Sequence, residues 1–486
     1  MLIEFDNTMA LVKPENKAEH ASLTAVREDA KVVAPGAKYM YAHKLYLRTK
    51  GKKGWDGKTS IISKAHLVTG SSHMPTGLVP TIYQELLERR VPASDIRFND
   101  LRAKPKEQGT GLHNLTLRGY QQDAFDIAIN NTFNGMTWPQ GVFKIATAGG
   151  KTELACALYQ GINVPTVFVV HRKHLIKQTR DRFSKYGVPT GQIGDGTFKP
   201  NEAGITVATI QTIHNTLKCG DSAKIATFIR ARQIFFDEAH LCAASLDKGN
   251  QFILLSRQFR HAYYRWGLTA TPFMKDSYSN QLLMGATGDV LYSISNDQLI
   301  KAGHLTKPKV TIIKCPPVKG PRTYPEVYDS AIVLNRWRNI KIIDELLKAP
   351  TPAIIMCNRI SHAKIIDNIA KHKGLILPVV QGSTSSTERA KILADLQSGR
   401  EKAIIATTVF DEGVDIPELR TIILAGAGKS RVAMLQRIGR GLRKATGKKE
   451  FKLIDFDDSA NGRIMKRHSA ARRKVWIEEG FCVEER

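Results

Sequence analysis

The sequence predicts an α/β protein in which two parallel-sheet domains follow one another, with a smaller α+β domain in front of them. Short apolar runs alternate with helix-like segments twice along the chain, a pattern typical of parallel strands joined by crossover helices. The length of 486 residues suits about three domains better than one hydrophobic core. We therefore expect domains at residues 1–108, 109–305 and 306–486.

The expected first domain has no glycine-rich loop of the kind that holds a phosphate. Asp56-Gly57 lies between extended-looking segments and predicts a tight hairpin turn. Lysines crowd this segment, at Lys50, Lys52, Lys53 and Lys58. A helical stretch is expected around residues 81–90, and residues 103–111 have the composition of a linker.

Extended apolar runs mark the expected strands of the two larger domains. In the second domain they are residues 142–146, 166–170, 205–208, 234–236 and 266–268. In the third domain they are residues 353–357, 375–380, 403–406, 421–424 and 451–454. Helical patterns separate the runs, so each set predicts one parallel sheet.

A glycine-rich segment follows the first of these strands. It passes from an apolar run through Ala148, Gly149 and Gly150 to Lys151-Thr152, and then enters a helix-like run. Backbone N–H groups and a helix N-terminus can face an anion there, as a phosphate-binding loop requires. Lys151 would reach the β- and γ-phosphates of a nucleotide, and the Thr152 hydroxyl would bind Mg²⁺. Ile145 stands where the first glycine of such loops is usual.

The strand at residues 234–236 ends in two acids, Asp237 and Glu238. Nucleotides sit at the carboxyl edge of open α/β sheets, so both carboxylates would face the phosphates. Asp237 would hold Mg²⁺ through water, and Glu238 would orient and deprotonate the attacking water. Together with the glycine-rich loop, this arrangement indicates a nucleoside triphosphatase.

The charge of the chain indicates a polyanionic partner. Lys and Arg total 72 against 45 acidic residues, a formal excess of +27. Such an excess favours a nucleic-acid backbone. Six scattered cysteines without Cys-x-x-Cys pairs indicate a reducing compartment and no zinc site. No long apolar run and no secretory leader are evident, so we expect a cytoplasmic protein without a membrane span.

Four segments occur in the order found in superfamily 2 helicases of the DEAH-box type, and residues 112–455 resemble that family. The segments are Gly150-Lys151-Thr152, Asp237-Glu238-Ala239-His240, residues 267–272 and residues 436–443. The resemblance implies two RecA-like domains that use ATP and Mg²⁺. It also implies that Arg440 and Arg443 reach the γ-phosphate from the second domain as arginine fingers, and that Gln436 of the same segment is a catalytic residue.

Further segments of that family can be placed in the sequence, and the resemblance assigns them roles. It implies that Arg118, Tyr120 and Gln121 frame the adenine, while Gly413 and Asp415 meet the rest of the nucleotide. His240, Thr269 and Thr271 would couple the nucleotide to the nucleic acid. The residues implied to contact the nucleic acid in these domains are His171, Arg172, Thr209, Gln211, Arg359 and Thr407.

Residues 54–58 and 74–78 resemble the N-terminal domain of the UvsW-type recombination helicases of tailed phages. The resemblance implies a motor that remodels branched DNA, working as a monomer with recombination or replication proteins. Lys52, Lys53, Trp55 and Lys58 would contact DNA. Hydrolysis would need only residues 112–455, so we expect an ATPase that survives removal of residues 1–108.

Three alternatives stay open: an RNA helicase or RNA-stimulated ATPase, the motor subunit of a restriction system, and a nucleic-acid-binding protein without ATPase activity. A basic helix is also expected after Asp458. Its apolar stripe would contain Ile464, His468, Ala471 and Val475 and pack on the third domain.

Overall fold

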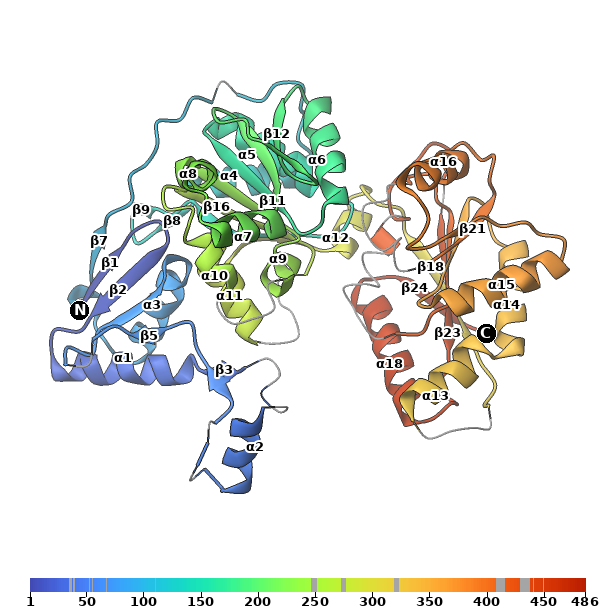
Figure 1. Ribbon diagram of the computed structural model, residues 1–486, viewed down its shortest axis with the longest axis horizontal. Helices are drawn as coiled ribbons and strands as arrows, with labels where there is room; N and C mark the ends of the chain where they lie inside the picture. Colours follow the sequence, from blue (N-terminus) through green and yellow to red (C-terminus); the bar gives the residue numbers. More distant parts are fainter. Residues whose placement is uncertain are drawn as a thin grey trace. The chain divides into compact units, whose positions relative to one another are not determined.

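The computed structural model describes residues 1–34, 37, 40–51, 53–54, 56–66, 68–109, 111–245, 251–271, 277–318, 323–407, 416–428, 438–439, 441–448 and 450–486. The chain divides into two compact units, each with its own parallel sheet (Figure 1). The first unit comprises residues 1–145 and 150–293. The second comprises residues 146–149 and 294–486.

A five-stranded mixed sheet begins the first unit, in the order β5-β6-β2-β1-β7. Its strands are β1 (Leu2–Phe5), β2 (Met9–Lys13), β5 (Ser63–Lys64), β6 (Ser72–Pro75) and β7 (Arg97–Asp100). β1 pairs antiparallel with β2 and parallel with β7. Every second residue of β1 and β2 is buried, because one face of this sheet covers the core. Helices α1 (Lys17–Asp29) and α3 (Val79–Glu88) pack against each other (Figure 1).

The predicted hairpin around Asp56-Gly57 is wrong. β4 (Lys58–Thr59) pairs with β3 (Val32–Val33), which lies much earlier in the chain. Helix α2 (Tyr41–Arg48) lies just before the segment that was expected to form the hairpin. Gly57 has a positive φ of 81°, and a Cβ there would lie 2.5 Å from the His43 ring. The glycine therefore serves close packing against α2 rather than a two-strand turn.

An eight-stranded sheet forms the core of the first unit, in the order β13-β12-β14-β11-β15-β16-β10-β17. Its strands are β10 (Gln140–Ile145), β11 (Thr166–Val170), β12 (Thr190–Gly194), β13 (Thr197–Lys199), β14 (Ile205–Thr209), β15 (Gln233–Asp237), β16 (Tyr264–Thr269) and β17 (Val290–Ile294). The pairs from β12 through β10 are parallel, and β13 is antiparallel to β12. A small hairpin, β8 (Thr132–Phe133) and β9 (Met136–Thr137), precedes β10.

The described helices that follow residue 112 in this unit lie between strands of the eight-stranded sheet or next to it in the sequence. They are α4 (Gly119–Asn130), α5 (Lys151–Ile162), α6 (His174–Lys185), α7 (Ile210–Cys219), α8 (Ser222–Arg230), α9 (Ala239–Ser245), α10 (Gln251–Ser256) and α11 (Ser277–Thr287). Two short turns, η2 (Thr76–Leu78) and η3 (Ala93–Asp95), belong to the N-terminal part.

The second unit holds a seven-stranded sheet in the order β20-β21-β19-β22-β23-β18-β24. Its strands are β18 (Pro308–Lys314), β19 (Ala353–Met356), β20 (Val379–Val380), β21 (Ala403–Ala406), β22 (Thr421–Leu424), β23 (Phe451–Asp457) and β24 (Cys482–Glu485), all paired in parallel. Its described helical segments are α12 (Asn296–Lys301), α13 (Tyr324–Tyr328), η4 (Asp329–Val333), α14 (Arg336–Leu347), α15 (Ile360–His372), α16 (Ser386–Gln397) and α18 (Arg463–Glu478).

The predicted fold class is confirmed. β11, β14, β19, β21 and β22 are buried at every position, as expected for parallel strands covered on both faces. All the expected apolar runs contain strands, although the run at residues 375–380 is a strand only at Val379–Val380. None of the described helices is long and apolar enough to cross a bilayer.

The N-terminal sheet and the eight-stranded sheet share one hydrophobic core. The cluster includes Ile3 and Phe5 of β1 together with Val142 of β10 and Leu282 of α11. The division at residue 108 therefore does not follow a gap in the packing, and the three-domain organisation stays a prediction.

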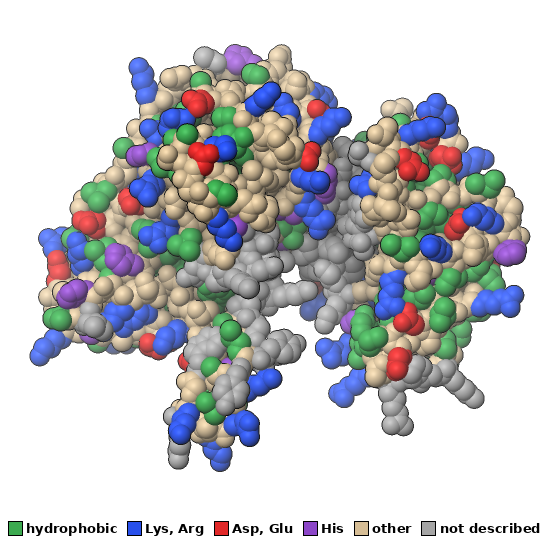
Figure 2. Space-filling view, viewed as in Figure 1, with side chains coloured by type: hydrophobic (Ala, Val, Ile, Leu, Met, Phe, Trp, Pro, Cys, Tyr) green, Lys and Arg blue, Asp and Glu red, His purple; other side chains and the backbone are tan. Residues whose placement is uncertain are grey.

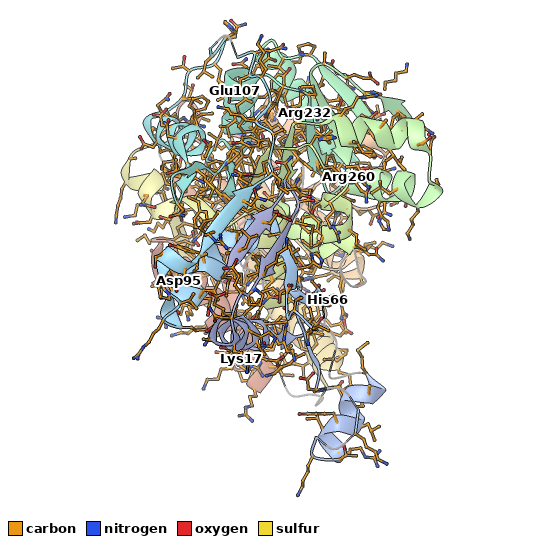
Figure 3. The ribbon with its side chains drawn as sticks, turned by 90° about the vertical axis from the view of Figure 1, so that its left-hand side faces the viewer. Lys17, His66, Asp95, Glu107, Arg232 and Arg260 are labelled. Atoms are coloured by element: carbon orange, nitrogen blue, oxygen red, sulfur yellow. The ribbon has the colours of Figure 1, made fainter. Side chains whose placement is uncertain are left out.

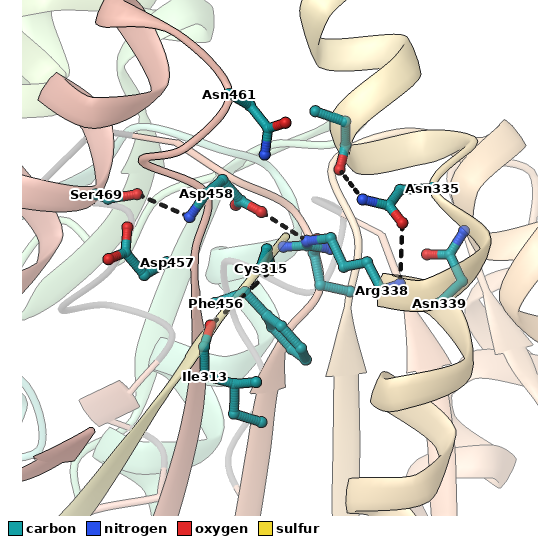
Figure 4. A network of polar contacts seen from close by, with 12 residues as sticks. Ile313, Cys315, Asn335, Arg338, Asn339, Phe456, Asp457, Asp458, Asn461 and Ser469 are labelled. Atoms are coloured by element: carbon teal, nitrogen blue, oxygen red, sulfur yellow. Dashed lines mark hydrogen bonds and ion pairs between the residues drawn. The ribbon is translucent and has the colours of Figure 1, made fainter. Parts of the chain in front are cut away.

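A buried ionic network fixes α14 and α18 in the second unit (Figure 4). Arg338 Nε donates to Asp458 Oδ1 at 3.0 Å, and Arg338 Nη1 donates to the Ala425 carbonyl at 2.6 Å. Arg472 of α18 pairs with Asp455 at 3.0 Å. The predicted stripe of α18 is therefore partly wrong, because Arg472 is buried while Ile464 is exposed.

Candidate active site

The carboxyl ends of five parallel strands of the first unit form one edge. β14, β11, β15, β16 and β10 are neighbours in that order. Residues in the segments that follow these strands therefore lie along the same edge. They include Lys151, Glu238 and Thr271, and also Arg172 and Gln211. The fold thus brings together the motifs that sequence analysis placed far apart in the chain.

The glycine-rich loop ends in a left-handed turn. Gly150 has φ +79° and precedes the first residue of α5. A Cβ on Gly150 would lie 2.2 Å from Gln121 Nε2. Gln121 Nε2 donates to the Gly150 carbonyl at 3.3 Å, and Gln121 Oε1 accepts from the Arg118 N–H at 3.0 Å. The segment predicted to frame adenine is therefore hydrogen-bonded to the glycine-rich loop.

Further predicted nucleotide contacts lie in this region. Arg118 Nη1 donates to the Tyr120 hydroxyl at 3.2 Å, so their side chains act as one group at the start of α4. Ala148 has φ +68°, which is unusual for a residue with a Cβ. Thr152 is the second residue of α5, so its position at the helix N-terminus agrees with the predicted loop.

Lys151 and Glu238 form an ion pair at the centre of the edge. Lys151 Nζ lies 3.3 Å from Glu238 Oε1 and 3.5 Å from the Ile145 carbonyl oxygen. The two side chains are only 11 % and 17 % exposed. Glu238 has a positive φ of 43°, a conformation that non-glycine residues adopt at a cost and that concentrates at functional sites.

A chain of polar contacts leads from Glu238 to the end of β16. His240 Nδ1 lies 3.6 Å from Glu238 Oε2 and 2.6 Å from Thr269 Oγ1. The Thr271 N–H donates to the same Thr269 hydroxyl at 3.1 Å. Burial lowers the pKa of His240, which favours the neutral imidazole. The three predicted coupling residues are thus in contact with one another and with the predicted base.

The two neighbouring carboxyls have different proton affinities. Burial and repulsion by Glu238 raise the pKa of Asp237 to about 6. Burial also acts to raise the pKa of Glu238, but the ion pair with Lys151 outweighs it and holds the pKa below its ordinary value. The environment therefore moves the pKa values of the two carboxyls apart, as it does where two carboxyls take different catalytic roles.

The polar atoms at this edge fit a phosphate ligand with Mg²⁺. Glu238 Oε2, His240 Nε2 and Thr271 Oγ1 are buried and have no hydrogen-bond partner among the described residues. In the described part of the chain, no cluster of three His, Cys, Asp or Glu side chains could hold a metal ion. Mg²⁺ at nucleotide sites needs few protein ligands, because phosphates and waters complete its shell. Thr152 and Asp237 are therefore a suitable donor set.

The predicted nucleic-acid contacts of the first unit differ in exposure. Arg172 and Gln211 are exposed, and His171 is partly buried. Thr209 is buried, and its hydroxyl accepts from the Thr212 N–H at 3.3 Å to cap α7. Lys53 and Lys58 are exposed beside α2, and the Lys58 N–H donates to Asp56 Oδ1 at 2.9 Å.

Three predicted residues of the second unit are described. Arg359 forms an ion pair with Asp329 and lies over the Tyr328 ring at 4.6 Å. Thr407 is buried, and its N–H donates to the Val380 carbonyl at 3.0 Å. Arg443 pairs with Leu305 in an isolated bridge. Lys52, Trp55, Pro272, Gly413, Asp415, Gln436 and Arg440 lie outside the described residues.

Sequence analysis missed Lys448, a buried lysine beside Arg443. Its Nζ donates to the carbonyls of Gly441 at 2.6 Å, Arg443 at 3.0 Å and Pro417 at 3.0 Å. Burial lowers the pKa of Lys448 to about 8. No local pattern distinguishes this lysine from its exposed neighbour Lys444, because its three partners come together only in the folded chain.

Two family models match the chain. Residues 114–274 match "Type III restriction enzyme, res subunit", and residues 338–445 match "Helicase conserved C-terminal domain". The first covers the edge that contains Lys151 and Glu238, and the second reaches Arg443. These matches imply ATP use and nucleic-acid binding.

Named relatives agree with these matches. The "ATP-dependent DNA helicase uvsW" of Enterobacteria phage T4 is 24 % identical, over 75 % of this chain and 72 % of its own. The "DNA 3'-5' translocase XPB2" of Sulfurisphaera tokodaii is 26 % identical, over 70 % of this chain and 81 % of its own.

A solved structure supports the fold. Dbp5 of S. cerevisiae, bound to RNA and ADP BeF3, has a TM-score of 0.52 at 16 % identity, over 76 % of this chain and 88 % of its own. At this identity the likeness concerns the fold only. Motifs, fold and family models agree: the chain contains the two domains of an ATP-dependent helicase, each built on a parallel sheet, and it resembles superfamily 2 helicases such as UvsW.

Proposed function

We propose that the protein is a DNA helicase or translocase that hydrolyses ATP with Mg²⁺ and remodels branched duplexes. The observation that carries the ATPase is the contact of Lys151 with Glu238, which continues through His240 to Thr269 and Thr271. These contacts connect a cation that binds phosphate, a base that activates water, and the residues proposed to couple the nucleotide to the nucleic acid.

Lys151 binds the β- and γ-phosphates and leaves Glu238 when it does so. The departure of this cation raises the proton affinity of Glu238, since the ion pair was holding its pKa down. Glu238 then takes a proton from the water that attacks the γ-phosphate. His240 Nδ1 lies beside Glu238 and also contacts Thr269 Oγ1 at 2.6 Å. A change of charge at Glu238 therefore alters the contact between His240 and Thr269.

Thr152 and Asp237 would hold Mg²⁺, which would supply positive charge to offset that of the β- and γ-phosphates. Asp237 must be ionised for this role, which its pKa of about 6 permits at neutral pH. Arg443 and Arg440 act on the γ-phosphate from the second domain. Gln121, Tyr120 and Arg118 frame the adenine.

Two observations support a nucleic-acid substrate, and a third favours DNA. The chain carries a formal excess of +27, which suits many phosphate contacts. On the face drawn in Figure 2, Lys and Arg side chains outnumber Asp and Glu side chains. The phage T4 relative is named as a DNA helicase. We propose a preference for branched duplexes because the N-terminal segments resemble those of UvsW-type proteins.

The test is one ATPase experiment with four activators: a four-way junction, a fork, a linear duplex of equal length and duplex RNA. We expect the junction and the fork to stimulate phosphate release most. Equal stimulation by linear DNA would overturn branch specificity, and preferred stimulation by RNA would overturn the DNA assignment.

A second candidate is the motor subunit of a restriction system, favoured by the family model matched at residues 114–274. Such a motor translocates along unbranched duplex. Stimulation that rises with the length of linear DNA, without any gain from a branch, would favour this candidate.

A further inference from the structure

We propose that a basic groove at the amino edge of the eight-stranded sheet binds the phosphate backbone of a second DNA arm. This inference rests on the proposed function and gives it a structural basis for branch recognition. The groove has a volume of about 870 Å³ and belongs wholly to the first unit.

The groove lies at the end of the sheet opposite the ATP site. One wall consists of residues that precede parallel strands: Pro165 before β11, Arg232 before β15, and Arg260 and His261 before β16. These strands are five or six residues long, so about 16–20 Å separates the two edges at roughly 3.3 Å per residue. A ligand in the groove therefore cannot contact the phosphates held by Lys151.

The other wall comes from the N-terminal part of the chain. It contains Asp6 and Asn7 between β1 and β2, and residues 103–106 after β7. Asn7 Nδ2 donates to the Arg260 carbonyl at 3.0 Å and joins the two walls. The groove therefore exists only because the N-terminal sheet packs on the eight-stranded sheet.

Cations outnumber acids in the lining. Five Lys and Arg side chains face two acids, Asp6 and Glu202. Asp6 accepts hydrogen bonds from the backbone N–H groups of Thr8 at 2.6 Å and Met9 at 2.8 Å. Its carboxylate is therefore already hydrogen-bonded within the β1–β2 turn. Glu202 pairs with Arg230 at 2.7 Å, and Lys104 pairs with Glu107 at 3.0 Å.

Three cations remain that have no ion pair among the described residues: Lys106, Arg232 and Arg260. Figure 3 shows Arg232 and Arg260 close together on this side of the molecule, with Glu107 beyond Arg232. Arg232 is partly exposed and Arg260 is exposed where they line the groove. A phosphate oxygen is the acceptor that arginine N–H groups favour.

The lining indicates backbone contacts rather than base contacts. No Phe, Tyr or Trp is among the described residues that line the groove. Single-strand sites depend on such rings for base stacking, whereas duplex DNA offers its phosphates without unstacking. A motor that holds one strand at the carboxyl edge and a duplex arm at the amino edge would distinguish a junction from a linear duplex.

The experiment compares the affinities of a four-way junction and a linear duplex of equal length for wild type and Arg232→Glu/Arg260→Glu. We expect about tenfold or greater loss for the junction and little change for the linear duplex. The log–log salt slope for the junction should become less steep by about 2, one unit for each lost phosphate contact. Lys17→Glu/Lys348→Glu makes the same change in net charge at exposed positions outside the groove and should leave both affinities close to wild type.

Two further measurements keep the test decisive. Arg232→Gln/Arg260→Gln, with a thermal midpoint compared with wild type, replaces the charge reversal if that variant unfolds. Hydrogen exchange of the wild-type protein should show protection of residues 103–106 and 230–232 by the junction but not by the linear duplex. If wild type prefers junctions and the groove variants keep that preference, the groove proposal is overturned. If wild type itself shows no preference, it is the branch-specific function that fails.

Discussion

Lys151 Nζ lies 3.3 Å from Glu238 Oε1, although each group has its own task in ATP hydrolysis. The ion pair keeps the carboxylate charged and its pKa low, and a base with a low pKa removes a proton poorly. In the proposed mechanism ATP binding draws Lys151 to the phosphates, so that Glu238 becomes a stronger base only when its substrate is present. The same contact therefore links nucleotide binding to activation of the water.

Asp237 gives the site a pH dependence. Its pKa of about 6 lies above the value of 3.8 for a free Asp, so protonation below about pH 6 should weaken Mg²⁺ binding. We expect the Mg²⁺ concentration for half-maximal ATPase to rise as the pH falls through 6. Titration of Mg²⁺ at several pH values measures this, and a constant half-maximal concentration would contradict the role of Asp237.

The same shift predicts a gain in stability from Asp237→Asn. Because the folded protein binds this proton more tightly than the unfolded chain, the favourable contribution of the group is present below pH 4 and is lost as pH rises through 6. At neutral pH the ionised side chain therefore costs stability, and Asp237→Asn should raise the thermal midpoint without nucleotide while reducing ATPase.

Gly150→Ala should reduce ATP affinity by about tenfold or more. The new Cβ would lie 2.2 Å from Gln121 Nε2, and φ at this position is +79°. Gly135→Ala is a matched control, because φ there is +78° and no heavy atom lies within 4 Å of its Cβ. The two variants thus share the backbone strain. Equal ATP affinities for both, measured by nucleotide titration, would show that the contact with Gln121 does not matter.

Lys448→Met should lower kcat with little change in ATP affinity. Its three carbonyl contacts fix the backbone at Arg443, and a misplacement of about 1 Å near the reacting atoms can cost about 10²-fold in rate. Lys444→Met, at an exposed neighbour, serves as the control. A loss of ATP affinity with unchanged kcat would exclude the positioning role.

Lys448 also predicts a decline in kcat at alkaline pH. Burial and the nearby Arg420 lower its pKa to about 8, while Glu418 acts in the opposite direction. Above pH 8 the neutral amine has two N–H donors for three carbonyls. The decline should be absent in Lys448→Arg, whose guanidinium stays charged.

Removal of residues 1–108 should destabilise the first unit, contrary to the sequence-based expectation of a clean truncation. The Arg102 guanidinium lies 4.5 Å from the Trp138 ring and 5.0 Å from the Phe5 ring, and donates to the Thr137 carbonyl at 2.8 Å. The truncation removes Phe5 and Arg102 from this cluster and exposes Trp138. We expect loss of solubility or a much lower thermal midpoint; a truncated protein as stable as the full chain would contradict the shared core.

The strands were predictable where burial is complete. Thr166–Val170, Ala403–Ala406 and Thr421–Leu424 are strands over the expected residues because continuous apolar runs suit sheets covered on both faces. β24 (Cys482–Glu485) was missed, since half-exposed polar residues give no such run. The burial of Arg472 in α18 depends on Asp455 of β23, a contact that local periodicity does not contain.

The site could be predicted where its residues belong to short sequence motifs. Lys151, Asp237 and Glu238 occur in short segments with a defined order along the chain, and the parallel sheet brings them to one edge. The roles of Lys448 and Arg232 could not be predicted, because each depends on backbone or cavity geometry assembled from distant segments.

Glu238→Gln tests the central assignment most directly. The amide keeps the size of the side chain but cannot accept the proton from water. ATP affinity and single-turnover phosphate release should be measured with the same protein, beside Lys151→Ala. The account predicts that Glu238→Gln binds ATP within about threefold of wild type while phosphate release falls by about 10²–10⁴, and that Lys151→Ala loses affinity as well. Phosphate release by Glu238→Gln at the wild-type rate would contradict the assignment of Glu238 as the base.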